Sequence, residues 1–146
     1  MQISSPAFKD GEELPEKYTC RGEGINPPLI ISDVPSNAVE LVLILDDPDA
    51  PSGNFNHWVV INIDLKVNNI LENSLPKGAV EGLNSASKSG YVAPCPPSGI
   101  HHYCFSLYAL DSKLNLSSPA NRDSVLKSME SHIILRANLV GLCKAK

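Results

Sequence analysis

Prolines and glycines interrupt this sequence so often that long helices are disfavoured. Twelve prolines and nine glycines separate short apolar runs over 146 residues. Proline cannot donate a hydrogen bond within a helix or at the centre of a sheet, so it is typical of turns and strand ends. Short apolar runs bounded by such residues predict β-strands. We expect strands at about residues 29–32, 39–45, 57–63 and 103–110.

The last part of the chain carries one helical pattern and one further strand. Val125, Met129 and Ile133 recur at helical spacing, which predicts a helix at about residues 121–131. The segment ILRANLVGLC (134–143) then alternates and predicts a closing strand. Residues 66–100 are irregular, and so long a loop within a compact domain is more often functional than not. The chain is therefore expected to be mostly β, with one or two short helices.

Length and charge limit the classes of protein to which the chain can belong. A length of 146 residues suits one domain spanning 1–146, which buries about two thirds of the unfolded surface. Sixteen acidic and twelve basic residues give a net charge of −4 without a basic cluster, so nucleic acid is not an expected partner. No leader pattern is visible, and no apolar run approaches the roughly 20 residues that cross a bilayer. We expect a cytoplasmic protein without a transmembrane segment.

The four cysteines carry little functional information. They are Cys20, Cys95, Cys104 and Cys143. Their spacing lacks the paired C-x-x-C pattern of zinc and redox sites, so neither a metal nor another cofactor is expected. Four cysteines allow two disulfides in three connectivities, but a protein without a leader usually keeps its thiols reduced. We expect buried free thiols.

Three carboxylates directly follow the most apolar strand candidate. Residues 41–45 read LVLIL, and Asp46, Asp47 and Asp49 come next. Prolines at positions 48 and 51 end the strand here, so these acids lie where the chain leaves the core. Aspartates in turns commonly accept hydrogen bonds from backbone amides, and taken alone they need no further role.

Histidines on two other strands give these acids a second interpretation. His57 opens the strand 57–63, although one histidine at the rim of an apolar strand is slightly more often a packing residue than a functional one. In GIHHYCFSLYAL (99–110), strand alternation places His101 and Tyr103 on one face and His102 on the other. If the three strands share a sheet, one pocket at its edge can collect several polar side chains. These are Asp47, Asp49, His57, His101 and Tyr103.

Four motifs in this chain resemble the signature segments of the phosphatidylethanolamine-binding protein family, which includes the Raf kinase inhibitor proteins. They are DPDAP (47–51), HWVVIN (57–62), YVAPCPP (91–97) and GIHHY (99–103). Two further segments, TCRGEGINPPLIISDVP (19–35) and ILRANLVGL (134–142), resemble its short bacterial and archaeal branch. The similarity thus extends over nearly the whole chain.

The resemblance implies a fold and a ligand pocket. The fold is a large central antiparallel sheet packed against a smaller one, with few helices. The pocket accepts phosphate-like anions, including phospholipid head groups and phosphotyrosine-like groups, so a non-enzymatic binding protein that modulates or inhibits other proteins is expected. His102 stands where many members have arginine, and alternation directs it away from the pocket. The family pocket falls on Asp47, Asp49, His57, Tyr91, Pro96, Pro97, His101 and Tyr103.

Aspartates in an anion pocket require a physical explanation. A carboxylate beside an imidazole favours its charged form and fixes its orientation, which makes His57 or His101 a better donor to a phosphate oxygen. The Tyr103 hydroxyl and backbone amides of residues 91–99 are further candidate donors. An aspartate can also accept from a protonated phosphate oxygen or from the ammonium group of ethanolamine. This chemistry predicts weak phosphate binding that depends on pH.

Three other functions use the same residues. A hydrolase is the least favoured, because Ser52 and Ser98 lie near the acids and histidines but the chain has no G-x-S-x-G elbow. A divalent metal site would suit two histidines with carboxylates. Inhibition of a serine protease or a kinase through the proline-rich segments 50–56 and 91–99 is the third, since rigid loops lower the ordering cost of docking. A sheet edge or a proline loop also offers a route to a homodimer.

Overall fold

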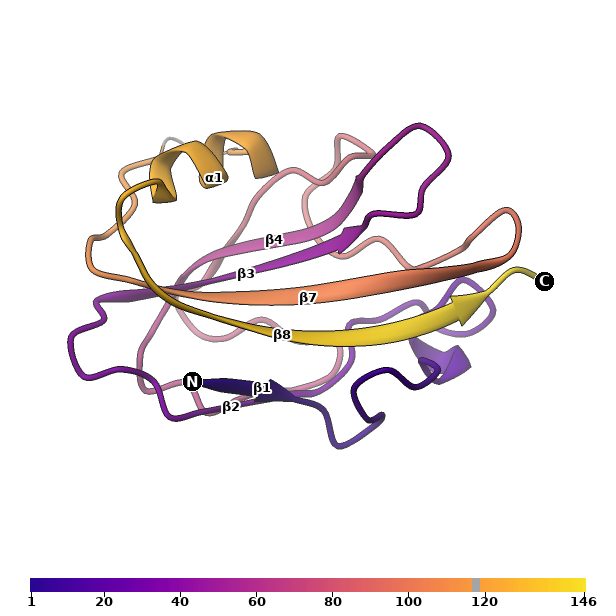
Figure 1. Cartoon of the computed structure of the whole chain (residues 1–146), viewed down its shortest axis with the longest axis horizontal. Coiled ribbons are helices and arrows are strands. Elements are labelled where there is room, and N and C mark those ends of the chain that lie inside the picture. Colours follow the sequence, from indigo (N-terminus) through magenta and orange to yellow (C-terminus); the bar gives the residue numbers. More distant parts are fainter. Residues whose placement is uncertain (117–118) are drawn as a thin grey trace.

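The computed structural model describes residues 1–116 and 119–146, and it consists of two antiparallel sheets and a short α-helix (Figure 1). The smaller sheet has the order β1-β2-β5, formed by β1 (Gln2–Ser4), β2 (Leu29–Ser32) and β5 (Asn69–Ile70). The larger sheet has the order β6-β4-β3-β7-β8, formed by β3 (Glu40–Asp47), β4 (Phe55–Ile63), β6 (Val80–Glu81), β7 (Ile100–Leu110) and β8 (Ile133–Lys144). A single 3₁₀ turn (η1, Glu16–Tyr18) and the helix α1 (Arg122–Met129) complete the described elements. The predicted mostly β fold with a larger and a smaller sheet is confirmed.

Each predicted strand is present, with ends that differ by a few residues. The segment expected at 57–63 begins two residues earlier, and the one expected at 103–110 begins three residues earlier. Most residues of these extensions are polar, namely Asn56, His101 and His102, and an apolar pattern does not mark them as strand. The irregular stretch 66–100 contains only the two-residue strands β5 and β6.

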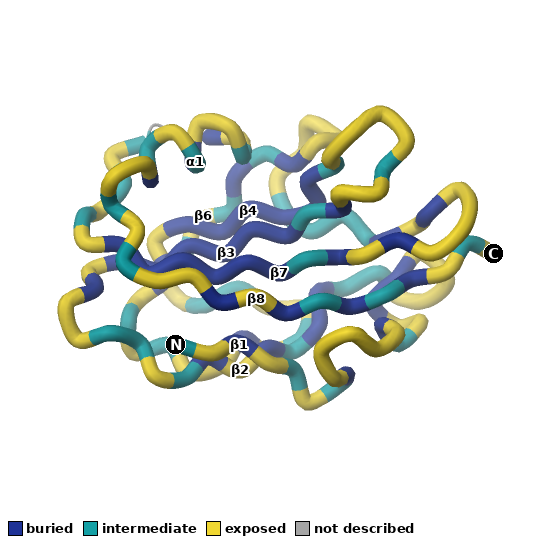
Figure 2. Tube along the Cα trace, in the orientation of Figure 1, coloured by how far each residue is buried: buried dark blue, intermediate teal, exposed yellow. Residues whose placement is uncertain are grey.

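The run LVLIL is continuously apolar because β3 is covered on both faces. Leu41, Leu43 and Leu45 face the smaller sheet and share a core with Leu29 and other residues of that sheet. Val42 and Ile44 face the opposite side, where α1 packs. Figure 2 shows the central strands of the larger sheet as buried along most of their length. Each fully buried side chain of this kind contributes about 1.5–3 kcal/mol, so β3 anchors both layers.

The helix is shorter than the pattern predicts, spanning Arg122–Met129 rather than 121–131. It begins after Asn121, whose side-chain oxygen accepts a hydrogen bond from the Ser124 amide at 2.9 Å, as N-cap residues do. It buries Val125 and Met129 against the larger sheet. It ends before Ser131, whose positive φ of 68° is incompatible with a continuing helix.

The expectation of reduced thiols is wrong for two of the four cysteines. Cys20 and Cys95 form a disulfide with a Cα–Cα distance of 5.4 Å, while Cys104 and Cys143 are free. The Cys20 amide donates to the Pro94 carbonyl at 3.1 Å, so the two segments lie side by side before the sulfurs are considered. Spacing along the chain does not reveal this tertiary contact.

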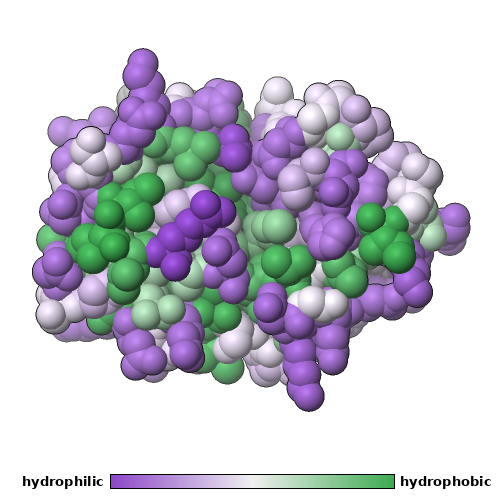
Figure 3. Space-filling model, in the orientation of Figure 1, coloured by the Kyte–Doolittle hydropathy of each residue, from purple (hydrophilic) through white to green (hydrophobic). Residues whose placement is uncertain are grey.

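Polar and apolar surface is unevenly distributed on the face shown in Figure 3. Polar side chains dominate the end of the molecule at which β3 ends and β7 begins, and apolar ones gather toward the opposite end. In the two described ranges, no helix combines the length and the apolar character needed to cross a membrane. The polar end is where the candidate site residues lie.

Candidate functional site

A change of register in the β3–β4 hairpin positions the site. Leu45 is paired with Trp58, whereas Asp46 is paired with Asn56, so His57 is an extra residue of β4. Such β-bulges redirect side chains and are frequent beside functional sites. Here the bulge leaves Asn56 bonded to Asp46, while His57 joins Asp47 on the opposite face of the sheet. β7 runs antiparallel to β3 and brings the start of its own strand to the same end.

These strand ends and the loop 92–97 enclose a cavity of about 230 Å³. This is smaller than the roughly 300–1,000 Å³ of sites for drug-sized ligands, and it suits a small group such as a phosphate-like head group. Six of the eight residues predicted for the pocket line it. The lining residues are Asp47, Ala50, Pro51, Phe55, His57, Val92, Ala93, Cys95, Pro96, Pro97, His101 and Tyr103.

A buried hydrogen bond joins Asp47 and His101. The Nδ1 atom of His101 lies 2.7 Å from Oδ2 of Asp47, and the two side chains are only 7% and 5% exposed. The other carboxylate oxygen of Asp47 accepts a hydrogen bond from the Asp49 amide at 2.9 Å. The pair fixes the imidazole ring and leaves its Nε2 as the nitrogen available to a ligand.

His57 is held differently, by the backbone of the loop that covers it. Its Nδ1 donates to the Val92 carbonyl at 2.7 Å, and the Val92 amide donates back to the His57 carbonyl at 2.9 Å. Burial lowers the pKa of His57 below its ordinary value of 6.5, although the Val92 carbonyl and the Asp47 carboxylate oppose this shift. His57 therefore also has its Nδ1 engaged, and in the neutral form its Nε2 is an acceptor.

The ring of Tyr103 lies between the two imidazoles. Its centroid is 5.2 Å from that of His57, edge-on, and 6.5 Å from that of His101. Burial, together with the nearby Asp47 carboxylate, raises the pKa of the Tyr103 hydroxyl, so this group stays protonated and can act as a donor. The alternation predicted for β7 is confirmed, since His101 and Tyr103 are buried while His102 is exposed on the other face.

Asp49 and Tyr91 do not line the cavity. One carboxylate oxygen of Asp49 accepts a hydrogen bond from the backbone amide of His102, and the same oxygen lies 2.7 Å from Nδ1 of that histidine. These two bonds lower the pKa of Asp49. The Tyr91 hydroxyl donates to the Tyr18 carbonyl at 2.8 Å, and its ring packs edge-on against Trp58. Asp49 thus holds the turn after β3, and Tyr91 anchors the covering loop.

Six lining residues are absent from the predicted set. Ala50 and Pro51 belong to the DPDAP motif itself, and Phe55 is the first residue of β4, four positions after that motif. Val92, Ala93 and Cys95 belong to the YVAPCPP motif. Val92 acts through its carbonyl, and no side-chain pattern marks a backbone acceptor.

The chemical groups of the cavity limit what it can do. Its lining contains no serine, threonine or free thiol, because Cys95 is in the disulfide. Throughout residues 1–116 and 119–146, no group of three or more histidine, cysteine or acidic side chains is arranged to hold a metal ion. What remains is a small, partly apolar space with two imidazoles, a carboxylate and a phenol.

This fold is that of a known protein family. The family model described as phosphatidylethanolamine-binding protein matches residues 4–144, and the chain belongs to this family. A UPF0098 protein from Methanothermobacter thermautotrophicus is 46% identical over 147 residues, covering 97% of each chain, and one from Chlamydia trachomatis is 44% identical with the same coverage. These archaeal and bacterial relatives confirm the predicted short branch.

Two crystal structures are similar over almost the entire chain. A phosphatidylethanolamine-binding protein homologue from Chlamydia trachomatis superposes with a TM-score of 0.95 at 43% identity, covering 99% of this chain and 97% of that one. YbcL from Escherichia coli, described as a member of the mammalian family, gives a TM-score of 0.92 at 30% identity, covering 99% and 98%. The predicted family and its fold are therefore confirmed.

Proposed function

We propose that this protein is a non-enzymatic receptor for a phosphate-like anion, such as phosphate, a phospholipid head group or a phosphorylated ligand, and that it modulates other proteins through this site. One observation carries the proposal. Both imidazoles of the cavity have Nδ1 bonded to a protein oxygen, His57 to Val92 and His101 to Asp47, which reserves both Nε2 atoms for a ligand. When both rings are protonated, their two Nε2–H groups and the Tyr103 hydroxyl form a set of donors suited to the oxygens of a phosphate group.

The carboxylate has a role in this binding. Asp47 accepts from Nδ1 of His101, which fixes the ring and leaves Nε2 free for a ligand. A doubly charged ligand would meet repulsion from Asp47, whereas a singly charged phosphate group that keeps a proton can donate it to an acceptor in the cavity. The combination of these donors with the Asp47 carboxylate therefore favours partly protonated or zwitterionic phosphate groups.

The absence of a serine, a threonine or a free thiol among the lining residues supports binding rather than catalysis. Covalent hydrolysis needs a serine, cysteine or similar group next to a base, and the lining offers none with a free hydroxyl or thiol of that kind. Tyr103 is the one hydroxyl in the lining, and its raised pKa makes it a poor nucleophile. We therefore propose no enzymatic activity at this site.

Phosphate affinity is expected to be several-fold higher at about pH 6 than at about pH 7.5. In the free protein the lowered pKa of His57 keeps its ring neutral at the higher pH, and Nε2 is then an acceptor facing an anion. An anion bound there stabilises the protonated ring, so a proton is taken up on binding and affinity rises as the pH falls. NMR titrations of the histidine ring protons with phosphate and phosphoethanolamine at both pH values measure this.

The same titration on a His101→Ala variant is the control. Saturable shifts confined to His57 and His101 in the wild type, and lost in the variant, are the expected result. Affinity that is unchanged between the two pH values, or shifts at His102 and His132 alone, would contradict the proposal, because those two rings pair with exposed aspartates outside the cavity.

Inhibition of a serine protease through an exposed loop is a second candidate function. The segment 51–54 is a turn that lies fully on the surface, and the loop 91–99 is tied to residue 20 by the disulfide, which restricts the freedom of this second loop. A His57→Ala/His101→Ala variant separates the two functions in an inhibition assay against a panel of serine proteases. Loop-mediated inhibition should persist in this variant, whereas inhibition that depends on a bound anion should be lost.

A further inference from the structure

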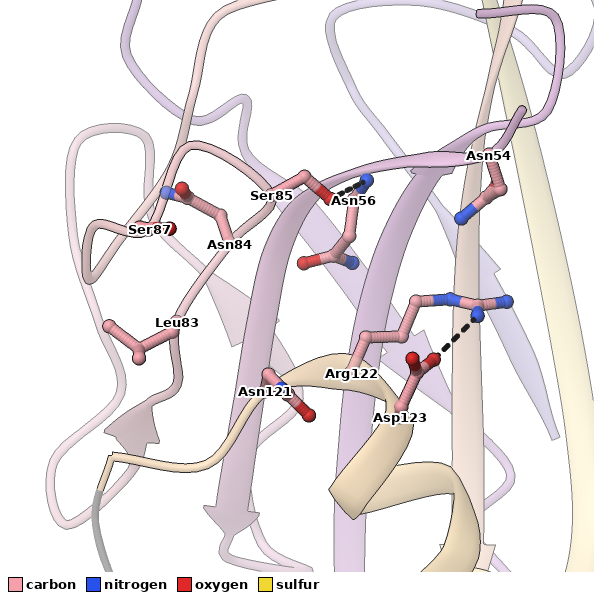
Figure 4. Close-up of a pocket in the computed structure, with 9 residues that line it drawn as sticks. All are labelled: Asn54, Asn56, Leu83, Asn84, Ser85, Ser87, Asn121, Arg122 and Asp123. Carbon is pink, nitrogen blue, oxygen red and sulfur yellow. Dashed lines mark hydrogen bonds and ion pairs between the residues drawn. The ribbon is translucent and has the colours of Figure 1, made fainter. Parts of the chain in front are cut away.

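A second cavity of about 310 Å³ lies on the opposite face of the larger sheet, between the start of β4 and the start of α1 (Figure 4). Its walls are held by backbone hydrogen bonds, from the Leu83 amide to the Ala120 carbonyl at 2.8 Å and from the Ser85 amide to the Asn56 carbonyl at 2.9 Å. The cavity is therefore built into the fold. Its lining is almost entirely polar and consists of Asn54, Asn56, Leu83, Asn84, Ser85, Ser87, Asn121, Arg122 and Asp123.

Asn56 presents an unsatisfied acceptor to this cavity. The residue is 2% exposed, and its Oδ1 has no hydrogen-bond partner among the described residues. The amide cannot be turned round, because Nδ2 is surrounded by three acceptors, the Leu45 and Trp58 carbonyls and the Asp46 carboxylate, at 2.9 to 3.2 Å. Figure 4 shows the amide of Asn56 pointing into the space between the labelled residues. A buried polar atom left without a partner is costly, so a ligand that donates to Oδ1 would be favoured.

Donors surround this acceptor. The Ser85 hydroxyl accepts a hydrogen bond from the backbone amide of Asn56 at 2.8 Å. The hydrogen of this hydroxyl is therefore left for a ligand. Arg122 uses Nε on Asp46 at 2.8 Å and Nη1 on Asp123 at 3.5 Å, and its Nη2 bonds to no described residue. The exposed side chain of Asn54 adds an amide on the same side as Arg122 (Figure 4). A ligand must therefore both donate and accept.

The charges and the lining exclude several ligand classes. Arg122 is flanked by Asp46 and Asp123, so the cavity has no surplus positive charge for a phosphate. The guanidinium in turn opposes a cation. Leu83 is the one apolar lining residue, which excludes a lipid chain or an aromatic ring. The cavity suits an uncharged molecule whose polar groups act as donor and acceptor at once.

We propose that this cavity binds a small uncharged polyhydroxylated molecule, a monosaccharide or a polyol. Hydroxyl groups donate and accept simultaneously, so adjacent ones can donate to Asn56 Oδ1 while accepting from Ser85 and Arg122. The site is distinct from the anion cavity and does not depend on it. The two lie back to back, because the neighbouring residues Asp46 and Asp47 point to opposite faces of the sheet.

The test is an amide-resolved NMR titration of the whole chain with glycerol, myo-inositol and D-glucose. At least one of the three is expected to give saturable shifts of the Asn56 side-chain amide and the Ser85 backbone amide, with a dissociation constant below about 10 mM. The histidine ring protons of the anion cavity should not move. Asn54→Ala and Ser85→Ala should each weaken binding by about fivefold, which is close to the loss of one hydrogen bond.

Asn68→Ala, an exposed asparagine remote from this lining, is the matched control and should bind as the wild type does. The proposal is overturned if none of the three polyols gives a saturable shift up to about 100 mM, or if both cavity variants bind with wild-type affinity. It is also overturned if acetamide saturates the site and the polyols do not, because the cavity would then recognise amides. Failure here leaves the phosphate titration unaffected, since that experiment reads His57 and His101.

Discussion

An Asp47→Ala variant is expected to lose about 3 kcal/mol of unfolding free energy and to bind phosphate at least tenfold more weakly than the wild type at about pH 6. The side chain is 5% exposed and provides two acceptors, one to His101 at 2.7 Å and one to the Asp49 amide at 2.9 Å. Its removal leaves the buried imidazole of His101 without the acceptor that fixes the orientation of its ring. Chemical denaturation at about pH 7 and calorimetric titration with inorganic phosphate measure the two effects.

Asp49→Ala is the matched control, because Asp49 is the same residue type two positions later. Its side chain is 38% exposed and pairs with His102, which is itself 56% exposed. Pairs so accessible to solvent contribute within about 1 kcal/mol, so stability should fall little and phosphate binding should be retained. Equal losses in the two variants would show that both aspartates act through the turn, and the role assigned to Asp47 would be wrong.

The sequence predicts the sheet well because the controlling forces are local and periodic. β3 could be placed from LVLIL, since five consecutive apolar residues require cover on both faces. The facing of His101 and Tyr103 followed from alternation along β7, which has no bulge in this part of its pairing with β8. Where a strand keeps a regular pleat, pattern is sufficient to place its side chains.

Elsewhere the site depends on tertiary contacts that no pattern encodes. The extra residue His57 breaks the alternation of β4, because it lies on the same face of the sheet as Trp58. The faces of Asn56 and His57 could therefore not be counted from residues 58–63. The Val92 carbonyl holds His57 through the backbone, which any residue type could supply. Asp49 was predicted for the pocket together with Asp47, but the turn directs its carboxylate to His102 instead. These departures occur where the chain leaves regular pleating.

Replacing both Cys20 and Cys95 with serine is expected to lower the free energy of unfolding by about 4 kcal/mol and to weaken phosphate binding. The bridge closes a loop between residues 75 positions apart, so its loss restores much conformational freedom to the unfolded chain. Cys95 also lines the cavity that contains His57 and His101. Without the disulfide, the loop 92–97 that covers this cavity is held by fewer constraints. Thermal unfolding with and without reductant measures the effect in the wild type, and Cys104→Ser is the control because that thiol is unpaired. Denatured wild-type protein should expose two reactive thiols before reduction and four after it. Four reactive thiols before reduction would refute the pairing of Cys20 with Cys95. Unchanged phosphate affinity in the double variant would show that the loop keeps its shape without the disulfide.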